Sequence, residues 1–256
     1  RIHAKYLRPK NTKNPHPAVL QFHGYTGDSG DWNDKLNYVA AGFSVAAMDC
    51  RGQGGLSQDK GGVTGNTHHG HIIRGLHDSN SVNDLLFRHI FLDTAQLANI
   101  IMELPEVDDS KVGAMGGSQG GGLTLACGSL EPSIKKLAPQ FPFLCDYKRV
   151  WDLDLDQKAY QELRDFFRKF DPRHEKAEKY FTRLGYIDVQ FLVERIQGEV
   201  LMGMGLIDEI CPPSTQFAAY NKINSNKKLK IYPDFGHERL PDFSDLTFNF
   251  MLDLKK

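Results

Sequence analysis

Short apolar runs alternate along the chain with longer stretches in which apolar residues return every three or four positions. Each short run ends at glycine or aspartate, as strands do where they lead into a loop at a sheet edge. The predicted strands are 18–24, 43–49, 111–117, 199–205 and 228–234, and the alternating start of the chain, residues 1–9, predicts one more. The predicted helices are 31–42, 88–104, 121–130 and 212–223. Strands and helices in alternation predict an α/β fold with a mostly parallel sheet and helices on both faces.

The stretch from about 140 to 198 breaks this alternation. It is charged and aromatic, its pattern is helical, and it holds no strand candidate. It lies between the fourth and fifth predicted strands, so we expect it over the carboxyl ends of the strands, where open α/β sheets bind their ligands. The chain has neither an internal repeat nor a low-complexity linker. We therefore predict one domain, 1–256, with a helical insertion that caps a pocket.

Composition and charge narrow the class of protein. The 256 residues are 40% hydrophobic and 25% charged, as in ordinary globular proteins. No run approaches the roughly 20 apolar residues that span a bilayer. A formal net charge of -1 gives no long-range attraction for nucleic acid or for an anionic membrane. Because the chain begins at Arg1, inside an alternating pattern, we expect further residues upstream of it.

The cysteines indicate the redox setting. They lie far apart and form no C-x-x-C pair, which favours reduced thiols in the cytoplasm over disulfides or a zinc site. The four are Cys50, Cys127, Cys145 and Cys211. We therefore predict a cytoplasmic protein.

The most unusual run of the sequence is GGSQGGG, residues 116–122, in which glycines surround one serine. It contains a G-x-S-x-G pattern between a predicted strand and a small-residue helix, which is the setting of a nucleophile elbow. Glycine on both sides leaves room for a strained turn that presents Ser118 Oγ at a helix N-terminus, where backbone N–H groups bind developing negative charge. A glycine-rich phosphate loop is the alternative, but the G-K-[ST] ending is absent and Gln119 stands where a cation would help.

A serine hydroxyl becomes a good nucleophile only when a base takes its proton. In an elbow of this type the acid and the histidine follow the serine in the chain, which leaves His174 and His237 as candidates. His174 lies within the insertion, and we expect it to be a solvated helix residue. His237 follows a predicted strand and has Gly236 before it, which leaves the loop free to aim the ring. We therefore predict that His237 is the base.

Asp208 is the predicted acid that orients the histidine. It lies in the loop after the predicted strand 199–205. Asp234 is an alternative, although it stands only three residues before His237, and Asp188 is a second alternative that lies in the insertion. Asp208 would hold the imidazole in one tautomer and stabilise the imidazolium without itself becoming protonated.

An oxyanion hole needs two preorganised N–H donors. The backbone N–H of Gln119, the residue after the nucleophile, is the first, and the N–H of Tyr25, in the loop after an early predicted strand, is the second. The alternative is that His23 and Tyr25 are ordinary loop residues. Tyr25 and the stretch from Gln140 to Phe143 are candidate pocket walls, and we predict that Tyr25 and Phe143 contact the substrate.

Three histidines in four positions, His68, His69 and His71, invite interpretation as a metal site. Metal sites gather ligands at i, i+4 on a helix or from separate loops, with carboxylates or cysteines completing the shell. The stretch 66–75 supplies neither pattern. We predict no metal and no other cofactor, and interpret the stretch as a structural loop or as one that meets another subunit.

Five stretches together resemble the acetyl xylan esterase and cephalosporin-C deacetylase family, the seventh carbohydrate esterase family. They are RGQGG (51–55), GHIIRG (70–75), GGSQGGG (116–122), IDEICPPST (207–215) and GHE (236–238). The resemblance runs across essentially the whole chain. It implies an α/β-hydrolase fold with a catalytic triad and an oxyanion hole. The residues it implies are Ser118, Asp208 and His237 for the triad and the amides of Tyr25 and Gln119 for the hole.

The resemblance also implies a function and a setting. Members of this family remove acetyl groups from small acetylated sugars, such as xylo-oligosaccharides, and from the cephalosporin side chain. They are cytoplasmic and form homo-oligomers, often hexamers, whose active sites face an internal cavity. They carry several tens of residues before the point where this chain begins, and that segment helps to shape the pocket and the subunit contacts.

Two other functions stay open at this point. A serine peptidase of the prolyl-oligopeptidase type has the same triad, but it usually carries a propeller domain and groups that hold a peptide terminus, for which this chain has no room. A non-catalytic binding protein with a hydrolase fold would normally lack one member of the triad. All three members are present here.

Overall fold

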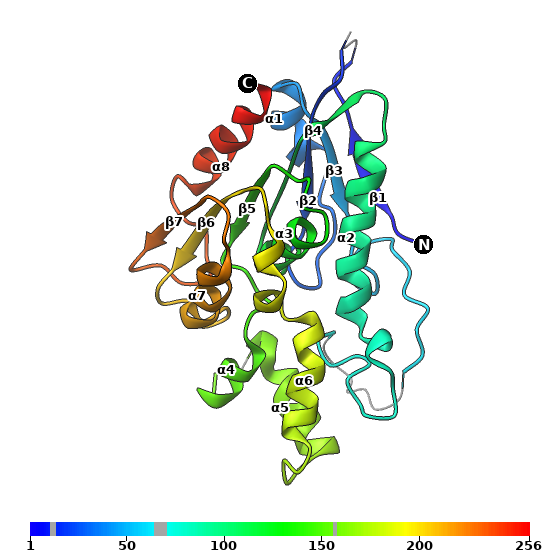
Figure 1. Cartoon of the computed structure of the whole chain (residues 1–256), viewed down its shortest axis with the longest axis vertical. Coiled ribbons are helices and arrows are strands. Elements are labelled where there is room, and N and C mark those ends of the chain that lie inside the picture. Colours follow the sequence, from blue (N-terminus) through cyan, green and yellow to red (C-terminus); the bar gives the residue numbers. More distant parts are fainter. Residues whose placement is uncertain (11–13, 64–70, 156–157) are drawn as a thin grey trace.

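Seven strands form one sheet at the centre of the computed structural model, which describes residues 1–10, 14–63, 71–155 and 158–256 (Figure 1). The strands are β1 (Ala4–Leu7), β2 (His16–Phe22), β3 (Ser44–Met48), β4 (Val107–Gly117), β5 (Lys136–Gln140), β6 (Glu199–Gly205) and β7 (Lys227–Tyr232). Their order across the sheet is β1-β3-β2-β4-β5-β6-β7. β1 pairs antiparallel with β3, and every other neighbouring pair is parallel.

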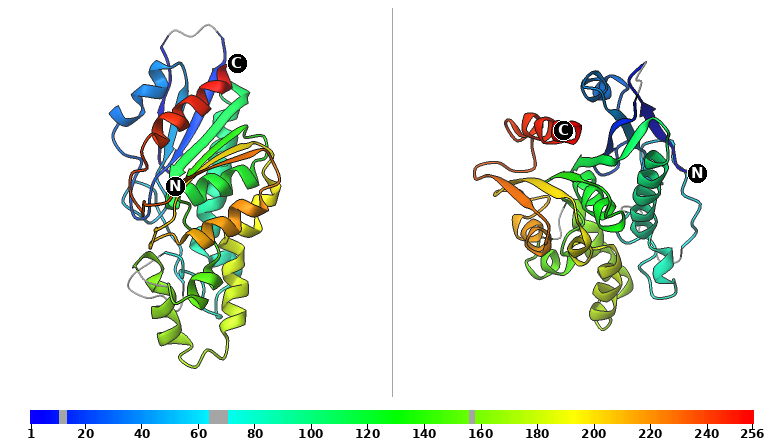
Figure 2. Two further views of the ribbon diagram at one scale, coloured as in Figure 1. Left: turned by 90° about the vertical axis from the view of Figure 1, so that its left-hand side faces the viewer. Right: turned by 45° about the horizontal axis from the view of Figure 1, so that its top comes forward.

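Helices cover both faces of this sheet (Figure 2). The α-helices are α1 (Leu36–Ala40), α2 (Leu86–Met102), α3 (Gln119–Leu130), α4 (Tyr147–Asp152), α5 (Gln161–Phe170), α6 (Ala177–Leu184), α7 (Pro213–Lys222) and α8 (Phe243–Leu252). Short 3-10 helices are η1 (Asn33–Lys35), η2 (Val82–Asp84), η3 (Lys158–Tyr160), η4 (Gly185–Ile187), η5 (Val189–Phe191), η6 (Val193–Arg195) and η7 (Asp253–Lys255).

The sheet divides the core into two clusters of buried apolar side chains. One cluster takes residues of α1 and α8, and the other takes residues of α2, α3 and α7. Along β2, Val19 belongs to the first cluster and Leu20 to the second, because successive side chains of a strand point to opposite faces. A mostly parallel sheet in this order, with helices on both faces, is the α/β-hydrolase fold, which confirms the predicted fold class.

The insertion gathers α4, α5 and α6 beyond one end of the sheet, as Figure 1 and Figure 2 show. It begins directly after β5, and its described residues, 141–155 and 158–198, contain helices and turns but no strand. The helical prediction for this stretch is therefore confirmed. Phe166 and Tyr180 of the insertion belong to the same buried cluster as Leu20 of the sheet.

Sequence patterns missed or misplaced several elements. β5 was not predicted, because its five residues include Pro139, and proline in a central strand removes a hydrogen-bond donor. α8 was not predicted either. The helix predicted over 31–42 is only η1 followed by the five residues of α1. His174 is exposed, as expected, but it lies in a turn with φ 56° between α5 and α6, and not in a helix.

Two further observations bear on the setting of the protein. No described helix is both long enough and apolar enough to cross a membrane. All four cysteines are free and buried. Burial raises the pKa of the Cys127 thiol to about 12, so this thiol stays protonated at neutral pH.

Candidate active site

Ser118 stands between the last residue of β4 and the first residue of α3. Its backbone has φ 57° and ψ −121°, a conformation that costs a residue other than glycine on the order of 1–3 kcal/mol. Its N–H donates to the carbonyl of Gln140 at 3.0 Å, and its own carbonyl accepts from the N–H of Gly122 at 3.1 Å. The serine therefore lies half-buried on a strained strand-to-helix turn, as the sequence pattern predicts.

Close backbone packing explains the glycines beside this serine. A Cβ on Gly120 would overlap the carbonyl oxygen of Phe22 at the end of β2. A Cβ on Gly121 would lie 2.7 Å from the carbonyl oxygen of Gln140, which is closer than real Cβ contacts come. The first turn of α3 thus packs directly on the backbone at the ends of β2 and β5, the strands on either side of β4, which only glycine permits.

We expect Gly120→Ala to lower the free energy of unfolding by about 3 kcal/mol or more, because the new methyl group meets backbone that cannot move aside. In a domain of this size that corresponds to a fall in Tm of about 6–12 °C. Gly117→Ala is the matched control, since its Cβ would lie 3.4 Å from a ring carbon of Phe141, an ordinary contact. Thermal unfolding followed by circular dichroism measures both, and equal Tm values would contradict this account of the turn.

His237 and Asp208 form a hydrogen-bonded pair. Nδ1 of His237 lies 2.9 Å from Oδ2 of Asp208, and the Asp208 side chain is fully buried while that of His237 is 17% exposed. Oδ1 of Asp208 accepts the N–H groups of Ile210 at 2.9 Å and Cys211 at 2.8 Å, so the carboxylate is held on both sides. Because an ionised carboxylate only accepts, Nδ1 carries the imidazole proton and Nε2 is left as the basic nitrogen.

The two alternative acids lie elsewhere. The carboxylate of Asp188 is buried and accepts the N–H groups of Asp146 at 2.9 Å and Gln190 at 3.1 Å. Burial raises the pKa of Asp188 to about 6. Asp234 is exposed to solvent. Among these three aspartates, the one that contacts His237 is Asp208.

Cys211 connects this pair to the serine. The Ser118 side chain is near enough to this buried thiol to oppose the rise that burial causes in the Cys211 pKa. The Cys211 Sγ also lies within 4.8 Å of a ring nitrogen of His237 and a carboxylate oxygen of Asp208. Ser118, Asp208 and His237 follow β4, β6 and β7, so all three lie at the carboxyl edge of the parallel strands. Burial raises the pKa of Cys211 well above its ordinary value, so the group next to the serine is a neutral thiol.

Sequence reasoning gave Cys211 no role. Asp208, Cys211 and His237 are also the one group in the described part of the chain whose side chains could together hold a metal ion. Two of the three already share the 2.9 Å hydrogen bond. A serine hydrolase uses the Asp208–His237 pair in that hydrogen-bonded arrangement without a metal.

The loop after β2 lies against the start of α3. A turn closed by the N–H of Gly27 on the carbonyl of Gly24, at 3.1 Å, places Tyr25 at its first corner. The side-chain NH₂ group of Gln119 lies 3.4 Å from the carbonyl oxygens of His23 and Gly24. Within the described residues, the backbone N–H groups of Tyr25 and Gln119 have no hydrogen-bond partner. Both remain available to a bound oxyanion.

Gln53 links the side chain of Gln119 to the loop that carries Tyr25. Its Nε2 donates to Oε1 of Gln119 at 2.7 Å, and its Oε1 accepts the backbone N–H of Thr26 at 3.0 Å. Arg51, in the same RGQ stretch, makes a bidentate ion pair with Asp93, with N–O distances of 2.7 and 2.6 Å. The sequence showed this stretch only as a motif, and the structure gives Gln53 a position next to both candidate oxyanion donors.

Two phenylalanines of the predicted pocket wall take different places. Phe143 is 1% exposed, and its ring centroid lies 5.5 Å from that of Tyr25 and 4.5 Å from that of Tyr160. Phe141 is half-buried, and its ring centroid lies 4.4 Å from that of His237. The buried ring of Phe143 therefore packs against the ring of Tyr25. Phe141 is the phenylalanine of this stretch whose ring packs against His237.

The histidine-rich stretch is described only in part. His68 and His69 lie outside the described residues. The ring of His71 packs edge-on to Tyr25 with centroids 5.5 Å apart, and its backbone N–H donates to the Tyr25 hydroxyl at 2.7 Å. Burial lowers the pKa of His71, which favours its neutral form. The described histidine of the three thus supports Tyr25.

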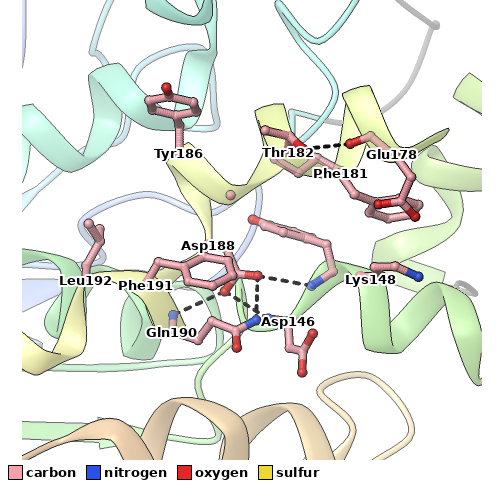
Figure 3. Close-up of a pocket in the computed structure, with 13 residues that line it drawn as sticks. Asp146, Lys148, Glu178, Phe181, Thr182, Tyr186, Asp188, Gln190, Phe191 and Leu192 are labelled. Atoms are coloured by element: carbon pink, nitrogen blue, oxygen red, sulfur yellow. Dashed lines mark hydrogen bonds between the residues drawn. The ribbon is translucent and has the colours of Figure 1, made fainter. Parts of the chain in front are cut away.

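A hollow of about 610 Å³ lies apart from this site, on the insertion (Figure 3). Phe181, Tyr186 and Phe191 stand around it, and the hydrogen-bonded carboxylate of Asp188 lies at its floor. None of the three predicted triad residues lines this hollow.

Comparisons with known proteins show what this chain is similar to. A family model described as acetyl xylan esterase (AXE1) matches residues 1–254. The crystal structure of acetyl xylan esterase 1 from Thermoanaerobacterium sp. JW/SL YS485 is 64% identical, with a TM-score of 0.97 over 100% of this chain and 80% of that one. The structure of an acetyl xylan esterase from Paenibacillus sp. R4 is 34% identical, with a TM-score of 0.88 over 98% of this chain and 78% of that one.

A curated relative extends the comparison. Acetyl esterase Axe7A of Xylanibacter ruminicola is 29% identical over 187 residues, which are 73% of this chain. The chain spans only 39% of the length of that relative. The family model, by contrast, covers nearly every residue of the chain. The chain belongs to the acetyl xylan esterase family, a family of carboxylic ester hydrolases.

Proposed function

We propose that this chain is a serine esterase that removes acetyl groups from small acetylated sugars such as xylo-oligosaccharides. The observation that carries the proposal is the 2.9 Å hydrogen bond between His237 and Asp208, which lies at the same edge of the sheet as the strained Ser118. The relatives reported above are named acetyl xylan esterases and an acetyl esterase, which supports the same class of substrate. We extend the proposal to the acetyl ester of cephalosporin C.

The first step forms an acetyl-enzyme. Ser118 Oγ attacks the acetyl carbonyl carbon while Nε2 of His237 takes the hydroxyl proton, and Asp208 stabilises the imidazolium through Nδ1–H. The carbonyl oxygen becomes an oxyanion that accepts the backbone N–H groups of Tyr25 and Gln119. When the tetrahedral intermediate collapses, the ester C–O bond breaks. The sugar hydroxyl then leaves with the proton from His237.

The second step returns the enzyme to its starting state. A water molecule gives one proton to Nε2 of His237 and attacks the carbonyl carbon of the acetyl-Ser118 ester. The same two N–H groups stabilise the second oxyanion. Acetic acid is released when the bond to Oγ breaks and the proton on His237 returns to the serine.

Acyl-chain length tests the proposal directly. We expect p-nitrophenyl butyrate to be hydrolysed with a kcat/KM about 30-fold or more below that of p-nitrophenyl acetate. Phe141 brings a bulky ring close to His237, and each methylene that does not fit costs on the order of 1–3 kcal/mol. Acetate release from acetylated xylo-oligosaccharides, measured beside both esters, links the result to a sugar substrate.

The outcomes separate the possible functions. Fast butyrate hydrolysis would contradict a small acyl site. Turnover of a peptide amide in preference to the acetyl sugar would favour a serine peptidase of the prolyl-oligopeptidase type. No turnover of any ester would favour a non-catalytic binding protein with this fold.

We also propose the organisation of the chain. Residues 1–256 form one domain, because the buried cluster that includes Leu20 of the sheet continues into the insertion through Phe166 and Tyr180. Four free, buried thiols favour a cytoplasmic location. The family resemblance supports a homo-oligomer, with a hexamer as the expected form.

A further inference from the structure

Glu162 is a buried carboxylate that the mechanism above does not use. It lies on α5, in the insertion, and is 4% exposed. Its Oε1 accepts a hydrogen bond from the Tyr25 hydroxyl at 2.7 Å, and its Oε2 accepts the backbone N–H of Ile73 at 3.2 Å. One side chain of the insertion thus holds two loops of the α/β domain.

The Tyr25 hydroxyl is the centre of this contact. It donates to Glu162 and accepts the backbone N–H of His71 at 2.7 Å. The ring itself is packed on two more sides, stacked on Phe87 with centroids 6.5 Å apart and tilted against Phe143 at 5.5 Å. Because the Tyr25 side chain is held at its hydroxyl and on the faces of its ring, the Tyr25 backbone has little freedom to move. The backbone N–H of this residue is one of the two candidate oxyanion donors.

The chemistry of the contact requires a carboxylate. Both oxygens of Glu162 accept, one from a hydroxyl and one from a backbone N–H, so the side chain needs two acceptors and no donor. Burial raises the pKa of Glu162 to about 7, while the Tyr25 hydroxyl and the N–H groups of residues 71–73 oppose that rise. A glutamine in its place would turn an NH₂ group toward one of these donors.

We propose that Glu162 is a positioning residue of the insertion that acts through the Tyr25 hydroxyl to hold the Tyr25 backbone N–H in the oxyanion hole. This inference rests on the proposed esterase function. Removal of one oxyanion donor from a serine hydrolase costs about 10²–10³ in kcat. When the donor is still present but less firmly positioned, kcat should fall by a smaller factor.

A double-mutant cycle on kcat tests the link. We expect Glu162→Gln and Tyr25→Phe each to lower kcat for p-nitrophenyl acetate by about 10-fold to 100-fold with KM changed less than about 3-fold, because the donor acts in the transition state. The double variant should lose about as much kcat as the more impaired single variant, since both changes break the contact between Tyr25 and Glu162. Tyr25→Phe keeps the backbone N–H, so any loss comes from its position.

Tyr180→Phe is the matched control in the same insertion. Its buried hydroxyl has no hydrogen-bond partner among the described residues, so its removal should leave kcat unchanged. Thermal unfolding of all variants shows whether each is folded at the assay temperature. Folded Glu162 and Tyr25 variants with wild-type kcat would overturn the inference. So would single losses that multiply in the double variant.

The design also separates this inference from the proposed function. If the wild type releases acetate and Ser118→Ala does not, the proposed esterase function is supported whatever the double-mutant cycle shows. If the wild type releases no acetate, the proposed function fails first. A fall in Tm for Glu162→Gln with unchanged kcat would assign Glu162 a purely structural role, which contradicts the inference and leaves the esterase intact.

Discussion

Ser118→Ala is expected to lower kcat for p-nitrophenyl acetate by a factor of about 10⁵ or more, because it removes the atom that attacks the carbonyl. The substitution takes away one oxygen and leaves the strained backbone at this position in place, so the fold should survive. The amides of Tyr25 and Gln119 also remain. The residual rate should therefore exceed that of the uncatalysed reaction, since these donors still stabilise an oxyanion formed by attack of water.

The measurement compares three proteins under one assay. Ser129→Ala is the matched control, because Ser129 is a buried serine of the adjoining helix α3 whose hydroxyl donates to the carbonyl of Leu125 at 2.7 Å. It should keep nearly full activity. Wild-type enzyme quenched early in turnover should also carry one acetyl group on the peptide that contains Ser118. An active alanine variant, or acetylation at another residue, would remove this serine from the mechanism.

The arrangement of the main elements could be predicted from sequence because it depends on local pattern. Five of the seven strands were located from short apolar runs and β1 from the alternating start of the chain, and the insertion was recognised by its lack of such runs. β5 was missed because Pro139 argues against a central strand. Its place between β4 and β6 is set by pairing with two strands distant in the chain, and the pattern of its own five residues carries no sign of that.

The candidate site was likewise predictable from the sequence only in part. Chain order and loop position were enough to propose Ser118, Asp208 and His237, because the carboxyl ends of parallel strands meet at one edge. The supporting contacts were not predictable. Tyr25 and Glu162 are 137 positions apart, and only the packing of the insertion on the sheet brings them together. The role of Gln53 likewise appears only when its amide is seen beside that of Gln119.

Asp208→Asn should lower kcat by about 10⁴-fold with little change in the fold. The reason lies in the backbone donors around the side chain. Oδ1 of Asp208 accepts the N–H groups of Ile210 and Cys211, and an asparagine can satisfy them only if its carbonyl oxygen takes that position. Its NH₂ group must then face Nδ1 of His237, where the wild type presents an acceptor at 2.9 Å.

That orientation reverses the tautomer of the histidine. Nδ1 must accept from the asparagine NH₂ group, so the imidazole proton moves to Nε2, and the base can no longer take the proton of Ser118. Asp234→Asn is the control, because Asp234 is exposed and stands three residues before the histidine, and we expect less than about a 2-fold change. Steady-state kinetics on p-nitrophenyl acetate, with Tm for each variant, measure both. If Asp234→Asn were the inactive variant and Asp208→Asn the active one, the acid would have been assigned to the wrong loop.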